Sequence, residues 1–163
     1  MVEFDELHAI LIPSIIEMIE QHQGLADFAS IRAKFEGWLK VEICNILSHH
    51  FENVLPEQNR IDISFNDWFI ELKTINTNYR HVNVRNMTRP ITENVKGIID
   101  DIDKLKRIKD KNRGILFIVF PVNEDNQQWL NHSRKITQKL GDYKITDFYF
   151  KNGVPGLIYF GIL

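Results

Sequence analysis

The sequence predicts an α/β fold in which helices flank a central mixed β-sheet. Three observations lead to this class. An alternating stretch at 60–74 predicts a β-hairpin, apolar residues at helical spacing follow at 91–108, and the unbroken apolar run at 114–121 is typical of a strand covered on both faces. A strand, a helix and a buried strand in succession imply a crossover connection, so residues 68–74 and 114–121 should be parallel neighbours.

Two helices and a short strand are expected before the hairpin. Apolar residues at helical spacing predict a first helix over residues 4–22, which Pro13 could bend. Ser30 could cap a second helix that carries an apolar stripe and runs to residue 50. A short strand is then expected near residues 51–55.

The third helix, at 91–108, should stop at Asn112-Arg113-Gly114, and a fourth is expected from Asp125 to Leu140, ended by Gly141. Two strands, at 145–150 and 156–163, close the chain. The chain has no internal repeat or linker composition, so one domain is predicted. Its parts would be an N-terminal helical extension at 1–29, a core at 30–121, and a C-terminal helix and β-hairpin at 122–163.

The composition predicts a soluble, cytoplasmic protein. At 163 residues and 44% hydrophobic, the chain can bury one full core. Its single cysteine, Cys44, excludes an internal disulfide and suits a reducing compartment. The acidic residues near the N-terminus argue against a targeting signal, and the apolar runs are too short to span a bilayer, so no membrane partner is expected.

The net charge of -2 conceals an asymmetry between the two halves of the chain. Residues 1–78 contain 5 Lys/Arg and 13 Asp/Glu, whereas residues 79–163 contain 15 and 9. A basic half is expected where one face of a protein meets phosphate. The basic run at 104–113 could instead complement the dipole at the end of a helix.

The hairpin at 60–74 assigns each of its side chains to a face. With Asn66-Asp67 as a two-residue turn, Phe65 lies opposite Trp68. One face is then entirely apolar and should be buried: Phe65 and Trp68, Ile63 and Ile70, Ile61 and Leu72. The other face pairs Ser64 with Phe69, Asp62 with Glu71, and Arg60 with Lys73.

Two carboxylates therefore oppose each other on one face, with Cβ atoms about 4.5–5.5 Å apart. Like charges at this spacing destabilise a sheet unless a positive charge lies between them. Mg²⁺, with Mn²⁺ as an alternative, binds through one or two carboxylates and keeps its waters, and Lys73 could position such a water. The other interpretation is a plain surface cluster of ion pairs. A second acid-x-Lys sequence, Asp142-Tyr143-Lys144, follows a helix and has no partner acid.

The stretch RIDISFNDWFIELK resembles the signature of the PD-(D/E)XK nuclease superfamily, which has the restriction-endonuclease-like fold. The resemblance implies that Asp62 and Glu71 are metal ligands, that the carbonyl of Leu72 is a further ligand, and that Lys73 orients the attacking water. Ile61 stands where the name of the superfamily has proline. The superfamily core would cover about residues 30–121.

The resemblance also implies an acid from the core helix, and the sequence offers Glu36 and Glu42. Six helical residues apart, the two point in different directions, so at most one can join the site. Glu42 is favoured because it is flanked by the apolar residues Val41 and Ile43.

The segment 76–90 follows the Lys73 strand and carries Arg80, Arg85 and Arg89 among Asn and Thr residues. These are side chains that contact phosphates and base edges, although an ordinary polar loop would look the same. Arg60, on the carboxylate face, could contact the scissile phosphate or pair with an acid.

The function expected is Mg²⁺-dependent hydrolysis of nucleic acid, with DNA as the favoured substrate of an endonuclease. One alternative is a non-catalytic subunit of the same fold that binds DNA or a partner protein. A two-carboxylate glycosidase is disfavoured, because neighbouring cations depress the pKa that a general acid needs raised. Cutting both strands of a duplex calls for two sites, so a homodimer is expected, and the apolar helix face at 4–19 is a candidate interface.

Overall fold

The computed structural model describes residues 2–85 and 91–163. The helices are α1 (Phe4–Gln21), α2 (Gln23–Ser30), α3 (Glu36–Ser48), α4 (Ile91–Lys106) and α5 (Gln127–Thr137). The strands are β1 (Leu55–Gln58), β2 (Ile61–Phe65), β3 (Trp68–Asn76), β4 (Asn112–Phe120), β5 (Tyr143–Tyr149) and β6 (Pro155–Ile162). Among the described residues, α1–α3 are followed by β1–β3, and helices and strands then alternate from α4 to β5 before β6 ends the order.

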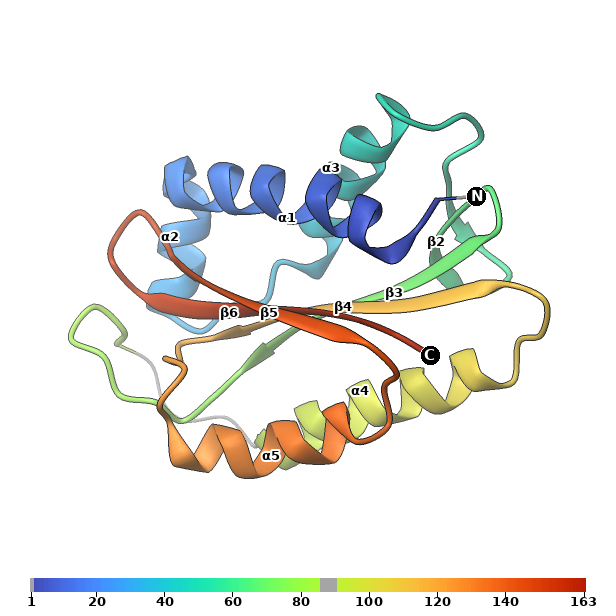
Figure 1. Cartoon of the computed structure of the whole chain (residues 1–163). Helices are drawn as coiled ribbons and strands as arrows, with labels where there is room; N and C mark the ends of the chain where they lie inside the picture. The colour runs from blue at the N-terminus through green and yellow to red at the C-terminus, as the bar shows by residue number, and fades with distance from the viewer. Residues whose placement is uncertain (1, 86–90) are drawn as a thin grey trace.

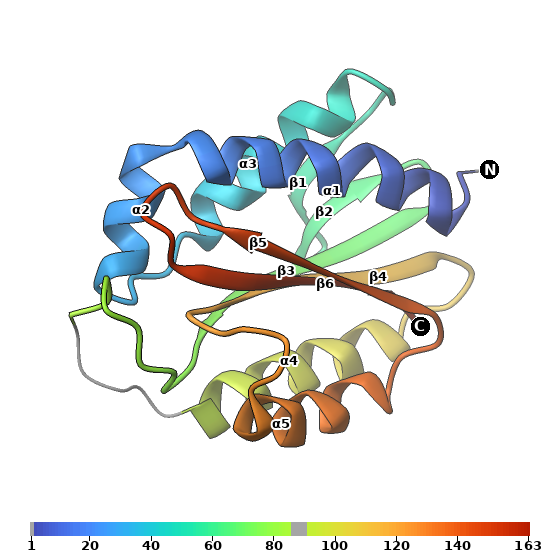
Figure 2. The ribbon, with the colours of Figure 1, turned by 60° about the vertical axis from the view of Figure 1, so that its left-hand side comes forward.

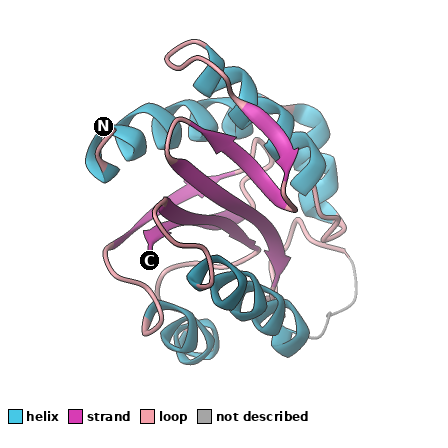
Figure 3. Ribbon diagram, turned by 90° about the vertical axis from the view of Figure 1, so that its right-hand side faces the viewer, coloured by secondary structure: helices cyan, strands magenta, loops and turns pink. Residues whose placement is uncertain are grey.

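One six-stranded sheet, ordered β1-β2-β3-β4-β6-β5, forms the centre of the fold. Helices α1, α2 and α3 cover one face, and α4 and α5 cover the other (Figures 1 and 2). Seen from the side, the sheet lies between the two helical layers (Figure 3). The predicted α/β class, with helices flanking a mixed sheet, is confirmed.

The parallel crossover is also confirmed. β3 and β4 are parallel from Trp68↔Asn112 to Asn76↔Phe120, and α4 connects them, whereas every other neighbouring pair in the sheet is antiparallel. β4 is buried from Gly114 to Phe120, because side chains on both of its faces are covered by helices.

The apolar face of α1 is buried inside the chain. Leu7, Leu11 and Ile15 are fully buried, and α1 packs against α3, β5 and β6. The expectation that the helix face at 4–19 forms a homodimer interface is therefore wrong, since this chain's own sheet and helices already cover it. Helical periodicity shows that a face is buried but does not show what covers it.

The helices near the N-terminus differ from the expected ones. Ser30 ends α2 instead of capping the next helix, and α3 begins at Glu36. The chain turns at Arg32, whose φ of 56° is left-handed and incompatible with a continuous helix. The short strand expected near residues 51–55 lies slightly later, at Leu55–Gln58.

Helix α4 also ends earlier than expected, at Lys106, and the following residues connect it to β4. None of the helices among the described residues combines the length and the apolar character that crossing a bilayer requires.

Candidate functional site

The β2–β3 hairpin has the predicted turn and register. Phe65 pairs with Trp68, Ser64 with Phe69 and Ile63 with Ile70. Asn66, the first turn residue, has a φ of 48°, which Asn tolerates better than most residues. The register expected from the alternation is confirmed over these three pairs.

Strand β2 leaves β3 beyond Ile63. The backbone N–H of Leu72 donates to Asp62 Oδ2 at 2.8 Å, where the predicted register would supply a backbone acceptor from Ile61. Ile61 instead packs in the core cluster beneath α4 and α5, while Leu72 lies in the cluster on the opposite face. The predicted Ile61–Leu72 pair on one buried face is therefore wrong, because a side-chain acceptor has replaced the backbone ladder at this point.

Two carboxylates occupy the edge of β3 that β2 has left. Asp62 accepts from the N–H of Leu72, and Glu36 Oε2 accepts from the N–H of Thr74 at 3.0 Å. The N–H and C=O of one strand residue point to the same side, so the Leu72 carbonyl also faces this edge. The edge thus brings together two acids and one backbone carbonyl oxygen.

Asp62 is held ionised by its surroundings. Burial opposes the charged form, but the Lys40 ammonium lies 2.6 Å from Asp62 Oδ1, and the Leu72 amide and a hydrogen bond with Glu71 also favour the anion. Together these contacts place the pKa of Asp62 below its ordinary value. Lys40, on α3, also contacts Glu57 of β1.

The pKa of Glu71 is shifted in the opposite direction from that of Asp62. Its side chain is almost fully buried, and this burial raises its pKa to about 8, with the hydrogen bond to Asp62 and the charge of Asp62 acting in the same direction. The ammonium of Lys104, on α4, contacts Glu71 Oε1 and lowers the pKa, but burial outweighs it. A pKa of about 8 favours the protonated form of Glu71 at neutral pH.

Lys73 lies on the α4 side of the sheet and pairs with Asp101, with 2.8 Å between Nζ and Oδ2. Burial alone would lower the pKa of Lys73, but Asp101, with help from Glu36 and Asp62, raises it. A Cβ at Gly97 of α4 would lie 3.5 Å from Lys73 Cε, so the helix packs closely over the lysine stem. Lys73 is thus a fixed, protonated ammonium group.

The structure brings Glu36, and not Glu42, to the hairpin. Glu36 is the first residue of α3 and reaches the edge of β3. Glu42 is half-buried on another side of α3, where it lines a shallow depression with Met18 and Trp38. Because they are six helical residues apart, Glu36 and Glu42 point in different directions, as expected from the sequence. The residue at which α3 begins determines that Glu36 is the one that contacts β3.

The arginines predicted to bind nucleic acid have different positions. The side chain of Arg60 is exposed, and its backbone carbonyl accepts from Lys104 Nζ at 2.7 Å, which places it next to Glu71. Arg80 and Arg85 are exposed in the loop after β3, and the N–H of Arg85 donates to the Ser30 carbonyl at 2.8 Å. Arg89 lies outside the described residues.

Sequence reasoning missed Lys40, Asp101 and Lys104, which contact the three residues of the hairpin signature. Helical spacing holds a partial signal for them. Lys40 lies four residues after Glu36, and Lys104 lies three residues after Asp101, so each pair shares a helix face.

The carboxyl groups of Asp62 and Glu71 and the carbonyl of Leu72 form a donor set that fits a small divalent cation. Within residues 2–85 and 91–163, no cluster of three or more His, Cys, Asp and Glu side chains is arranged around a metal position. Mg²⁺ does not need such a cluster, since it binds through one or two carboxylates and retains waters. The raised pKa of Glu71 shows that burial outweighs the stabilisation of its anion by Lys104, and a divalent charge would stabilise that anion further.

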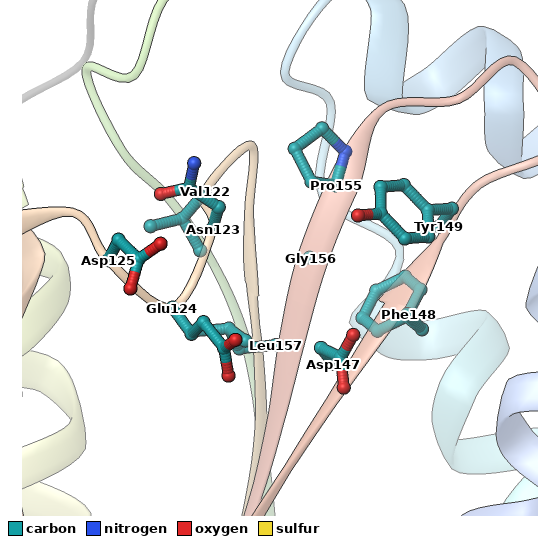
Figure 4. A pocket seen from close by; sticks show the side chains of 10 residues that line it. All are labelled: Val122, Asn123, Glu124, Asp125, Asp147, Phe148, Tyr149, Pro155, Gly156 and Leu157. Atoms are coloured by element: carbon teal, nitrogen blue, oxygen red, sulfur yellow. The ribbon is translucent and has the colours of Figure 1, made fainter.

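A separate cavity of about 190 Å³ opens beside the ends of β4, β5 and β6 (Figure 4). Its lining includes the carboxylates of Glu124, Asp125 and Asp147 together with Tyr149. None of the hairpin residues described above lines this cavity. Glu124, Asp125 and Asp147 are exposed, unlike the half-buried Asp62 and the buried Glu71.

Comparison of the chain with protein-family models, with curated proteins and with solved structures finds no match.

Proposed function

We propose that the chain is a Mg²⁺-dependent phosphodiesterase that hydrolyses nucleic acid, with DNA as its substrate, and that its fold is the restriction-endonuclease-like fold of the PD-(D/E)XK superfamily. The observation that carries the proposal is the hydrogen bond between the Asp62 and Glu71 carboxyl groups where β2 leaves β3, with Lys73 two residues further along. We also place the protein in the cytoplasm, where the free thiol of Cys44 would remain reduced.

Asp62, Glu71 and the carbonyl of Leu72 would hold the metal, with Mn²⁺ as an alternative to Mg²⁺. When bound, the metal supplies positive charge to the phosphate and lowers the pKa of a coordinated water. Lys73, fixed by Asp101, donates hydrogen bonds that orient the attacking water and stabilise its developing negative charge. Glu36 fixes the edge of β3 through the N–H of Thr74 and so holds the backbone between Leu72 and Thr74 in place.

A second function, a non-catalytic subunit that binds DNA or a partner protein, is favoured by one observation. Both candidate ligands already contact lysines, Asp62 with Lys40 and Glu71 with Lys104. A site whose acids are neutralised by its own chain could be a stable cluster that never takes up metal. The two functions differ in whether a metal displaces these ammonium groups.

Plasmid DNA incubated with the purified protein and Mg²⁺ distinguishes the two functions. We expect cleavage that EDTA abolishes and that Lys73→Ala reduces by at least about a hundredfold, the usual contribution of a group that stabilises developing charge. Lys144→Ala, in the second acid-x-Lys sequence, is the matched control and should cleave normally. Wild-type cleavage by Lys73→Ala would exclude the phosphodiesterase assignment, and DNA retention without cleavage in Mg²⁺ or Mn²⁺ would support the binding subunit.

Cutting both strands of a duplex calls for two sites, so we propose that the active form is a homodimer. Light scattering of the protein with duplex DNA should give the mass of two chains. A single chain per duplex, together with double-strand cleavage, would contradict this part of the proposal.

A further inference from the structure

A strongly basic segment runs from the end of α4 into its connection with β4. Between residues 104 and 111 it carries Lys104, Lys106, Arg107, Lys109 and Lys111, against a single acid, Asp110. All of these except Lys104 are exposed. Helix α4 ends at Lys106, so the helix dipole accounts for Lys104 and Lys106 but not for the three cations that follow.

Both ends of this segment are fixed against the hairpin. At one end, Lys104 contacts Glu71 and donates to the carbonyl of Arg60. At the other end, Lys111 Nζ lies 5.8 Å from the centroid of the Phe69 ring. Phe69 and Glu71 are two residues apart in β3 and so share one face of the sheet. The basic segment therefore follows that face of the hairpin from the carboxyl pair towards the turn.

The connection to β4 continues this contact. The N–H of Asn112 donates to the carbonyl of Asp67 in the hairpin turn at 2.8 Å. Figure 1 shows the end of α4 and the connection to β4 at the same end of the sheet as this turn. The position of the basic segment is thus determined by backbone and side-chain contacts at both of its ends.

One row of α4 side chains leads from the site into the segment. Asp101 and Lys104, three residues apart, contact Lys73 and Glu71 respectively, and Arg107 follows at the same spacing. Asp103, the nearest acid on the helix, already pairs with Lys139 of the α5–β5 connection at 2.9 Å. Within the part of the chain that the structure describes, Lys106, Arg107, Lys109 and Lys111 form no ion pairs.

We propose that residues 104–111, together with Arg60, bind the phosphodiester backbone of nucleic acid beside the carboxyl pair, so that the polynucleotide leaves the site along the α4–β4 connection. The inference rests on the proposed function for its choice of ligand. Exposed lysines and arginines in a row match the repeating negative charge of a nucleic-acid backbone. Such contacts fix the position of the substrate and supply affinity, but they read no base sequence.

The test measures how the affinity for nucleic acid depends on salt. The variant Lys106→Gln/Arg107→Gln/Lys109→Gln removes three exposed charges from the segment. Its matched control, Arg134→Gln/Lys135→Gln/Lys151→Gln, removes three exposed charges from α5 and the β5–β6 turn, so both proteins have the same net charge. Binding to fluorescent duplex DNA and to duplex RNA of equal length is measured in EDTA between about 50 and 200 mM KCl.

Each lost phosphate contact should reduce the magnitude of the slope of log binding constant against log salt concentration by about 0.9. The magnitude for the segment variant should therefore be lower than that of the wild type by up to about 3. The control should keep the wild-type slope. Equal slopes for the segment variant and wild type, or equal losses in both triple variants, would overturn the inference, as would wild-type protein that binds neither DNA nor RNA. The two duplexes show which polynucleotide the surface takes.

The result is separable from the test of the proposed function, because EDTA removes catalysis from the measurement. Binding that depends on residues 106–109, without cleavage in Mg²⁺, would contradict the phosphodiesterase proposal and support the proposed binding surface. Cleavage by a protein whose salt slope does not depend on these residues would do the reverse.

Discussion

Replacing Glu71 by glutamine should remove a pH-dependent loss of stability. Burial raises the pKa of Glu71 to about 8, from a reference value of 4.5. Because the folded pKa is the higher one, the folded protein keeps a proton that the unfolded chain releases. The contribution of Glu71 to the free energy of unfolding is therefore greatest below about pH 4.5 and falls as the pH rises towards 8.

The size of this effect follows from proton linkage. One proton corresponds to about 1.4 kcal/mol for each pH unit between the two pKa values. Between about pH 5.5 and about pH 7.5, the wild-type protein should lose about 2–3 kcal/mol of stability relative to Glu71→Gln. Glutamine has the same shape, can donate to Asp62, and has no proton to release, so the difference isolates the ionisation of Glu71.

Urea denaturation in EDTA, followed by circular dichroism at several pH values, measures this difference. Glu42→Gln makes the same chemical change on α3 away from the hairpin and should follow the wild-type pH dependence. Parallel stability curves for wild type and Glu71→Gln across this range would contradict a raised pKa of Glu71, because they would mean that Glu71 ionises as easily in the folded protein as in the unfolded one.

Three further predictions concern the same residues. Mg²⁺ affinity should rise by up to about tenfold for each unit of increasing pH below pH 8, because binding expels the proton of Glu71. Calorimetry in buffers of different ionisation enthalpy should detect the released proton. Binding whose affinity does not depend on pH would contradict this expectation. Asp101→Asn should lower kcat more than it raises KM, because Lys73 loses the carboxylate that fixes it. Asp101→Glu should restore part of kcat. An effect on KM alone would argue against Asp101 as the residue that positions Lys73. Glu36→Ala should lower the free energy of unfolding by about 1–3 kcal/mol, because the buried N–H of Thr74 loses its acceptor. The control Glu42→Ala should change the free energy of unfolding by less than about 0.5 kcal/mol. Equal losses for the two variants in urea denaturation would contradict the placement of Glu36.

The sequence specified the hairpin register because two independent signals agreed on it. The alternation of apolar and polar residues has a period of two, and Asn66-Asp67 suits a tight turn. A slip of one residue would have placed charges in the core. The same reasoning could not foresee that β2 leaves β3 at Asp62, because a side-chain acceptor competes there with the backbone ladder, and alternation contains no information on that competition.

The helix acid could not be chosen from local sequence. The apolar neighbours of Glu42 favour it only if one long helix begins at Ser30, but the chain breaks at Arg32 and α3 begins at Glu36. The break places the first residue of α3, with its long side chain, beside β3. Glu42 follows almost two turns later and faces α1 and the α1–α2 junction.

The lysines that contact the site were missed for a related reason. Lys40 and Lys104 come from helices on opposite faces of the sheet, and their partners are fixed only when those helices pack. Spacing along a helix shows which residues share a face, but not which strand that face meets. The exposed positions of Lys106, Arg107, Lys109 and Lys111 could likewise be seen only once α4 was shown to end at Lys106.

The most direct test of the proposed metal site is a crystal structure of the protein soaked in Mn²⁺, whose anomalous scattering identifies the ion. We predict a peak about 2–2.5 Å from a carboxylate oxygen of Asp62 and one of Glu71, with the ammonium of Lys104 moved away from Glu71. A map in which Mn²⁺ binds elsewhere, while Lys40 and Lys104 still hold the two acids, would contradict this prediction.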